Sequence, residues 1–204
     1  MLDTLGNRPL PGRRLFMASL ASLMAGVQPA FANTPRSALF SSLSGASFRK
    51  YGMGEPVGVV LTDFSCPYCR LLDAELARLT KARPGHAFAM LDMPLLGQGS
   101  VAAAKLEWVA GQRGKAMSAH AAMMSGPRPS NSTEYAARIA AVIGEADMSG
   151  DAASPMAQRF IDDCLAYGRA AGVTGVPAII FVDGTQSKGW STDVPAMLAR
   201  GTAT

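Results

Sequence analysis

The sequence predicts an α/β domain in which a βαβ unit and a ββα unit are separated by a block of helices. The first unit begins with the nearly continuous apolar stretch Val57–Phe64, which is typical of a strand buried on both faces. A helical pattern of leucines follows and ends at Pro84-Gly85. A second apolar stretch covers Ala87–Met93. This spacing fits two parallel strands that are joined through a helix.

The region 97–171 is predicted to be a helical insertion between the two units. Its expected helices, separated by breaks rich in Gly and Pro, are Val101–Trp108, Ala116–Met124, Glu134–Ile143 and Pro155–Ala171. The ββα unit follows the insertion. Its expected parts are a strand over Ala178–Val182, a hairpin turn at Asp183-Gly184, a second strand near Gln186–Trp190 and a last helix over Val194–Arg200.

The first 32 residues are predicted to be a secretory signal peptide. Arg13-Arg14 precedes the apolar stretch Leu15–Val27, which leads to Ala30-Phe31-Ala32, and we expect cleavage after Ala32. The apolar stretch has about 13 residues, whereas a membrane-spanning helix needs about 20. The arginine pair fits either the twin-arginine or the Sec export route. The mature protein is then expected to be one domain comprising residues 33–204.

Charge and cysteine content restrict the classes of function. Removal of the signal peptide takes away three arginines and one aspartate, which lowers the net charge from +4 to about +2, so charge gives nucleic-acid binding no support. The charges in the mature chain form no stripe and are interpreted as solvated: Arg36, Arg49, Lys50 and Arg78. The chain has three cysteines, too few for a disulfide-stapled scaffold. Cys164 lies on an apolar helical face, which favours a buried thiol.

The other two cysteines, Cys66 and Cys69, stand where the first strand passes into the helix. At a helix N-terminus, open N–H groups and the helix dipole stabilise a thiolate, so Cys66 is expected to attack first. Cys69 lies nearly one turn later and can close a small disulfide ring, which makes it the resolving partner. Pro67 fits the first turn of the helix, and Tyr68 can cover one side of the sulfur.

Metal binding is the alternative to redox chemistry. A zinc site would need further ligands, but the sequence has no second cysteine pair, and the spacing of His86 and His120 is not that of metal ligands. Both histidines are interpreted as ordinary ones. Because of the methionines in the insertion, a periplasmic copper-binding protein remains an alternative function, although methionine also fills cores and client grooves. These methionines are Met117, Met123, Met124, Met148 and Met156. A client-holding protein that uses the same cysteine pair is a further alternative.

Two motifs carry a resemblance to a known family. They are Phe64-Ser65-Cys66-Pro67-Tyr68-Cys69 and Gly172-Val173-Thr174-Gly175-Val176-Pro177. Together with the strand and Asp183-Gly184 that follow, they resemble the DsbA-like family of bacterial disulfide oxidoreductases, over nearly all of Val57–Arg200. The resemblance implies a thioredoxin fold and a cis peptide bond before Pro177, which would pack beside the active-site disulfide. It also implies that Val176 offers its backbone to an extended client peptide.

The resemblance further implies a periplasmic enzyme that acts on exported proteins with cysteines, exchanges electrons with a membrane redox partner and needs no bound cofactor. Many family members carry a buried acid six residues before the nucleophile, where this chain has Val60. Asp63 stands three residues before Cys66, as in disulfide-isomerase relatives and some other DsbA-like proteins, and is a candidate for moving the proton of Cys69. The residues 33–56 are too few for the dimerisation domain of the isomerase branch, so an oxidase is favoured over an isomerase or reductase. A cytosolic glutaredoxin, suggested by Cys-Pro-Tyr-Cys alone, does not fit the signal peptide.

Overall fold

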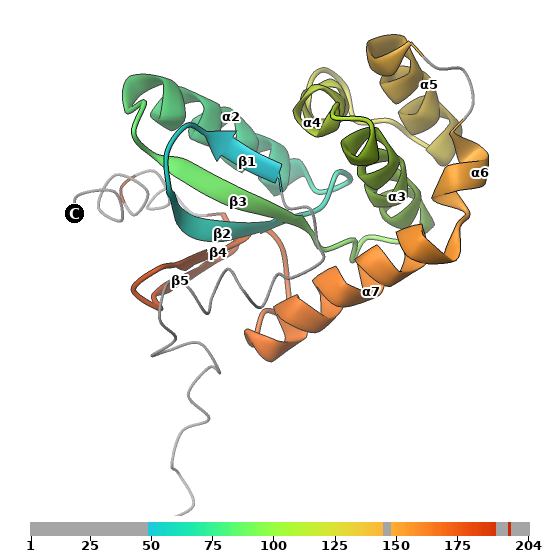
Figure 1. Cartoon of the computed structure of the whole chain (residues 1–204). Coiled ribbons are helices and arrows are strands. Elements are labelled where there is room, and N and C mark those ends of the chain that lie inside the picture. Colours follow the sequence, from blue (N-terminus) through green and yellow to red (C-terminus); the bar gives the residue numbers. More distant parts are fainter. Residues whose placement is uncertain (1–48, 145–147, 191–195, 197–204) are drawn as a thin grey trace, which may run out of the picture.

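A mixed five-stranded sheet forms the centre of the structure (Figure 1). The computed structural model describes residues 49–144, 148–190 and Ala196. The strands are β1 (Arg49–Gly52), β2 (Pro56–Thr62), β3 (Ala87–Asp92), β4 (Ala178–Phe181) and β5 (Gln186–Lys188). The helices are α2 (Pro67–Ala82), α3 (Gln98–Gln112), α4 (Ala116–Met124), α5 (Ser132–Ile143), α6 (Ser149–Ala152) and α7 (Pro155–Ala170). Within these described ranges, no helix is both long and apolar enough to cross a membrane.

The order of strands in the sheet is β1-β3-β2-β4-β5, so β2 lies at the centre. β2 and β3 are parallel and are joined through α2, as the predicted βαβ unit requires. β4 is antiparallel to β2, with Ile180 opposite Val59, and β5 is antiparallel to β4. In the turn between β4 and β5, the Asp183 carboxylate accepts hydrogen bonds from the backbone N–H and the hydroxyl of Thr185. Both predicted strand units are therefore present, and they meet where β2 pairs with β4.

The helices α2 and α7 cover opposite faces of the sheet (Figure 1). Neighbouring residues of a strand point to opposite faces. Val60 accordingly packs in a core with Leu72 and Leu76 of α2. Val59 belongs to the larger core on the other face, which contains Ile161 of α7. Because helices cover both faces, β2 is apolar along nearly its whole length instead of alternating with polar residues.

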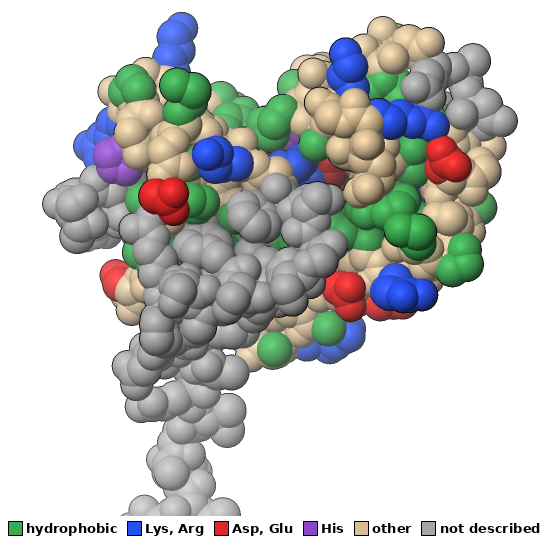
Figure 2. Space-filling model, viewed as in Figure 1, with side chains coloured by type: hydrophobic (Ala, Val, Ile, Leu, Met, Phe, Trp, Pro, Cys, Tyr) green, Lys and Arg blue, Asp and Glu red, His purple; other side chains and the backbone are tan. Residues whose placement is uncertain are grey.

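The predicted helical insertion is built around α3. This helix contacts α4, α5, α6 and α7, and its buried side includes the small residues Ala103 and Ala110, which let neighbouring helices approach closely. α3 begins at Gln98, earlier than the sequence pattern indicates, and the short helix α6 was not predicted at all. In the space-filling view, the helical block and the α2 side of the sheet form two lobes separated by a notch (Figure 2).

β1 was also not predicted, and it overturns the interpretation of Arg49 as a solvated charge. The strand pairs antiparallel with β3, placing Arg49 opposite Met90. Arg49 is only 5% exposed, and its guanidinium donates two hydrogen bonds, at 2.8 and 3.0 Å, to the carboxylate of Asp92 on β3. It also forms an ion pair with Glu107 of α3. The arginine is buried because two buried carboxylates from other elements surround it, a condition that a search for charge stripes does not detect.

Several expectations fall on parts of the chain outside the described residues. They are the signal peptide over 1–32 with its cleavage after Ala32, the surface position of Arg36 and, apart from Ala196, the last helix over 194–200. Lys50 and Arg78 are exposed, as expected for solvated charges.

Candidate active site

Cys66 is the N-cap residue of α2, and its sulfur accepts from the first turn of the helix. The backbone of Cys66 is extended (φ −83°, ψ 120°), and its Sγ accepts a hydrogen bond from the backbone N–H of Cys69 at 3.3 Å. Pro67 occupies the first turn, where its missing N–H costs nothing, and the first turn contains no acidic side chain. The N–H donor and the positive end of the helix dipole both favour an anionic sulfur at this position.

Cys69 has a different environment. The residue is 1% exposed, against 4% for Cys66. Burial raises the pKa of the Cys69 thiol far above its ordinary value, and the hydrogen bond to the Cys66 sulfur and the charge of that sulfur raise it further. The backbone N–H of Asp63 and the hydroxyl of Thr62 act in the opposite direction with smaller effect. The two thiols are therefore chemically unequal, since Cys69 retains its proton while the position of Cys66 favours an anion.

The loop before β4 comes next to the cysteines although it is remote in the sequence. The Val176–Pro177 peptide bond is cis, as the resemblance implies. The Cys66 thiol donates to the carbonyl oxygen of Val176 at 3.6 Å, across 110 residues of sequence. Pro177 is buried, and its carbonyl oxygen accepts a hydrogen bond from the backbone N–H of Gly189. The backbone of Val176 therefore lies directly beside Cys66.

The arrangement of dithiol and cis-proline loop agrees with the comparison to known families. The model of the DSBA-like thioredoxin domain matches residues 59–201. The chain belongs to this family. The family consists of thiol–disulfide oxidoreductases, and the predicted fold class, a thioredoxin fold with a helical insertion, is confirmed. No curated protein sequence matches the chain.

Solved structures similar to this DSBA-like domain share its fold. A periplasmic thioredoxin-like protein from Salmonella enterica serovar Typhimurium has 21% identity and a TM-score of 0.68, with 81% of this chain and 97% of that chain covered. The catalytic domain of Proteus mirabilis ScsC has 22% identity and a TM-score of 0.65, with coverages of 83% and 99%. A thioredoxin-like oxidoreductase from Silicibacter pomeroyi DSS-3 has 26% identity and a TM-score of 0.64, with coverages of 86% and 99%.

Asp63 of the DSBA-like domain is fully engaged by backbone donors. Its Oδ1 accepts a hydrogen bond from Ser65 N at 2.7 Å, and its Oδ2 accepts from Leu95 N at 2.8 Å and from Leu96 N at 3.0 Å. The side chain thus joins the loop before Cys66 to the loop after β3. The effect of Asp63 on Cys69 comes from its backbone N–H, which lowers the pKa of the Cys69 thiol. These contacts favour a positioning role for the carboxylate over the proton transfer that the sequence suggested.

Two arginines that the sequence analysis missed bind the main chain immediately before Cys66. Arg70 donates from Nη2 to the carbonyl oxygen of Phe64 at 3.2 Å, and Arg128 donates from Nη1 to that of Ser65 at the same distance. The hydroxyls of Ser65 and Tyr135 also form a hydrogen bond, at 3.2 Å. Arg70 directly follows Cys69, so its proximity was readable from the sequence. Arg128 comes from the turn after α4, and no local signal connects it to Ser65.

A buried ionic cluster lies beneath Phe64 and consists of Arg49, Asp92, Glu107, His120 and Asp73. The Arg49 guanidinium lies 5.7 Å from the centre of the Phe64 ring, and His120 packs edge-on against the same ring. His120 Nε2 is 2.6 Å from Asp73 Oδ1, and its Nδ1 is 3.8 Å from Glu107 Oε1. Burial, and secondarily the charge of Arg49, lower the pKa of His120. His120 is therefore neutral at pH 7 and is not the ordinary helix histidine that the sequence suggested.

The remaining sulfur atoms lie mostly in the core. Met123, Met124 and Met148 are buried, as expected for core packing, whereas Met117 and Met156 are exposed. Cys164 is 1% exposed, and burial raises the pKa of its thiol, which fits the buried thiol that was expected. In the part of the chain that the structure describes, no three His, Cys, Asp or Glu side chains are grouped so as to hold a metal ion.

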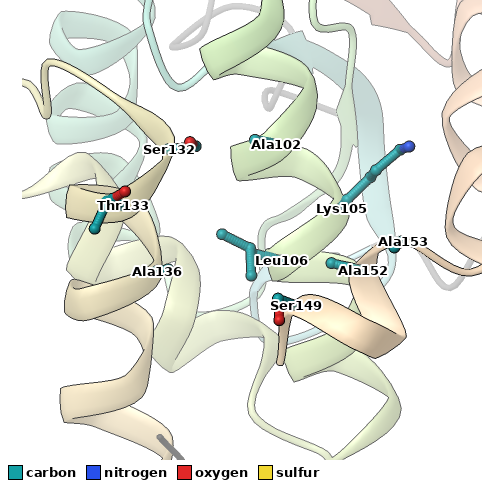
Figure 3. Close-up of a pocket in the computed structure, with 9 residues that line it drawn as sticks. All are labelled: Ala102, Lys105, Leu106, Ser132, Thr133, Ala136, Ser149, Ala152 and Ala153. Carbon is teal, nitrogen blue, oxygen red and sulfur yellow. The ribbon is translucent and has the colours of Figure 1, made fainter. Parts of the chain in front are cut away.

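A cavity of about 390 Å³ lies away from the cysteines, between α3, α5 and α6 (Figure 3). Leu106 of α3 points into it, opposite Ala136 of α5, and Ala152 of α6 closes another side. None of the residues that surround the dithiol lines this cavity, so it is separate from the candidate active site.

Proposed function

We propose that this protein oxidises dithiols in exported client proteins, with Cys66 as the reacting cysteine and Cys69 as its resolving partner. The observation that carries the proposal is the inequality of the two thiols at the start of α2. Cys66 Sγ accepts an N–H from the helix, whereas burial raises the pKa of Cys69. Val176 and Pro177 form the loop at which an extended client would dock.

The exchange proceeds in two balanced steps. A client thiolate attacks Cys66 Sγ of the oxidised protein, the Cys66–Cys69 bond breaks, and Cys69 leaves and takes up a proton, as its raised pKa demands. A second client thiolate then attacks the client sulfur of the mixed disulfide, and Cys66 leaves as an anion. Two electrons pass from two client thiols to the protein dithiol. A membrane redox partner would remove them and restore the disulfide.

The surroundings of Cys66 support the oxidising direction. The N-cap hydrogen bond and the cationic groups of Arg70 and Arg128, which bind the two preceding carbonyl oxygens, favour an anionic sulfur. That anion exists only in the reduced protein or as a leaving group. Stabilising it therefore makes the disulfide a stronger oxidant and speeds the second step. Clients would replace the Cys66 thiol as donor to the Val176 carbonyl oxygen, because an extended peptide offers N–H groups there.

Export to the periplasm is part of the proposal. The pattern of residues 1–32, with cleavage after Ala32, supports it, and the similar protein from Salmonella enterica serovar Typhimurium is described as periplasmic.

The reduction potential of the Cys66–Cys69 pair in glutathione buffers tests the direction of the reaction. We expect a potential near that of DsbA, about −120 mV, with rapid oxidation of a reduced client protein. A potential near that of thioredoxin, about −270 mV, together with rescue of a client with scrambled disulfides, would assign an isomerase or reductase instead. Absence of any exchange would reject the enzyme and leave client holding or copper binding, which titration with Cu(I) separates.

A further inference from the structure

Two arginines, Arg70 and Arg128, bind the main chain that leads to Cys66, and a third, Arg138, binds the turn that carries Arg128; we call these three residues the basic rim. Besides its bond to Phe64, Arg70 donates to the carbonyl oxygens of Met123 and Met124 at the end of α4, at 2.7 and 2.6 Å. Arg138 of α5 donates to two further carbonyl oxygens of the following turn, those of Ser125 and Pro127. Arg70 and Arg138 thus anchor the turn that carries Arg128. Arg128 is exposed and lies next to Ser65.

The charge of the basic rim is not balanced by bound carboxylates. Its hydrogen bonds go to neutral groups, namely carbonyl oxygens and, for Arg70, also the side chain of Tyr135. Hydrogen bonds from Ser130, and to a smaller extent the charge of Arg138, lower the pKa of Glu134, but among the described residues no carboxylate forms an ion pair with any of the three arginines. The buried Arg49, in contrast, binds Asp92 and Glu107. The rim arginines are close enough to repel one another, since the charges of Arg138 and Arg128 add to burial in lowering the pKa of Arg70. In Figure 2, Lys and Arg side chains lie over the α4–α5 end of the helical block.

We infer that the basic rim selects client segments with acidic side chains next to the reacting cysteine, through the exposed guanidinium of Arg128. The inference rests on the proposed exchange with clients at Cys66. Arg128 holds the carbonyl oxygen of the residue that precedes Cys66, so a client cysteine bonded to Cys66 brings its neighbours to this guanidinium. Only one of the five N–H donors of Arg128 is used for Ser65, which leaves donors for a bidentate bond to a carboxylate.

Three dithiol peptides that differ only in the residues flanking each cysteine test the inference, with glutamates, glutamines or lysines at those positions. The rate of disulfide transfer from the oxidised protein is followed by acid quenching and mass separation. The flanking charges also change the reactivity of the peptide thiols, so the informative quantity is how the glutamate-to-lysine rate ratio differs between proteins. At low salt, we expect the glutamate-to-lysine rate ratio of Arg128→Gln to be about threefold or more below that of the wild type. We also expect the ratio of the wild type itself to fall when the salt concentration is raised, because salt screens the charge.

Two further variants separate charge from other effects. Arg128→Lys keeps the charge and should retain most of the wild-type ratio. Arg78→Gln removes the same charge at a position about 18 Å from Cys66 along α2 and should leave the ratio unchanged. A ratio that is equal in the wild type and in Arg128→Gln would overturn the inference, while exchange with the glutamine peptide would leave the proposed function intact. Failure to exchange with any of the three peptides would instead reject the proposed function, and this inference with it.

Discussion

Replacing Arg49 with Met should destabilise the protein strongly, because it removes the cation from two buried carboxylates. Arg49 forms a two-bond contact with Asp92 and an ion pair with Glu107, whose side chains are 1% and 2% exposed. Removal of one partner from a buried ion pair costs about 3–5 kcal/mol, because the remaining charge is left uncompensated. Domains of this size have a free energy of unfolding of about 5–15 kcal/mol, so the loss would be a large fraction of the total.

The pH dependence of this loss identifies its cause. Burial already raises the pKa of Asp92 in the wild type, against the opposing effect of Arg49, and without Arg49 only the smaller effect of His120 opposes burial. The pKa of an Asp side chain in the unfolded chain is about 3.9. When the pKa in the folded protein is higher than this, the carboxyl contributes to stability at low pH, where it is protonated, and this contribution is lost as the pH rises through the folded pKa. The deficit of Arg49→Met should therefore be largest at pH 7 and should shrink at pH 5.

Urea unfolding of the reduced protein, followed by far-ultraviolet circular dichroism at both pH values, measures the deficit. Arg78→Met is the matched control, because Arg78 is 66% exposed and pairs with Glu75 at the surface, and it should unfold close to the wild type. The triple variant Arg49→Met, Asp92→Leu, Glu107→Leu should recover much of the loss, since no buried charge is left unpaired. A deficit below about 1 kcal/mol at pH 7, or one that is the same at pH 5, would refute this account of the cluster.

Three further measurements test other parts of the structure. Mixed with a client that carries a disulfide, Cys69→Ser should accumulate a mixed disulfide through Cys66 on non-reducing gels and Cys66→Ser should not; equal trapping by both variants would contradict the proposed roles. Because the pKa of His120 is lowered in the folded protein, the unfolded chain binds a proton first as the pH falls below about 6.5. The free energy of unfolding of the wild type should therefore fall by up to about 1.4 kcal/mol per pH unit in this range. In urea titrations, His120→Gln should lack this slope. Gly52→Ala, at φ 87° and against a backbone carbonyl oxygen, should lower the melting temperature more than Gly114→Ala, at φ 71° but in open space; equal losses would show that the close approach is unimportant.

The proposed reacting pair, Cys66 and Cys69, is local in the sequence, and so its position at the start of α2 was predictable. An apolar strand that runs into Cys66, a proline suited to a first helical turn and leucines at helical spacing are sufficient to place Cys66 at the start of α2. The inequality of the two thiols was also expected from position alone, although the effect of Thr62 on Cys69 was not. The position of Val176–Pro177 beside Cys66 came from the family resemblance and not from spacing, because 110 residues separate them.

The sequence by itself determined the elements whose signals are short-range: the central strands, the helix after the cysteines, most of the helical insertion and the family. Tertiary structure alone decided the burial of Arg49, whose partner Asp92 is 43 residues away, and the approach of Arg128 to Ser65 across 63 residues. The physical reason is that periodicity and capping report the preferences of neighbouring residues. The environment of a charge depends on which remote groups desolvate or neutralise it, and those groups are known only when the chain has folded.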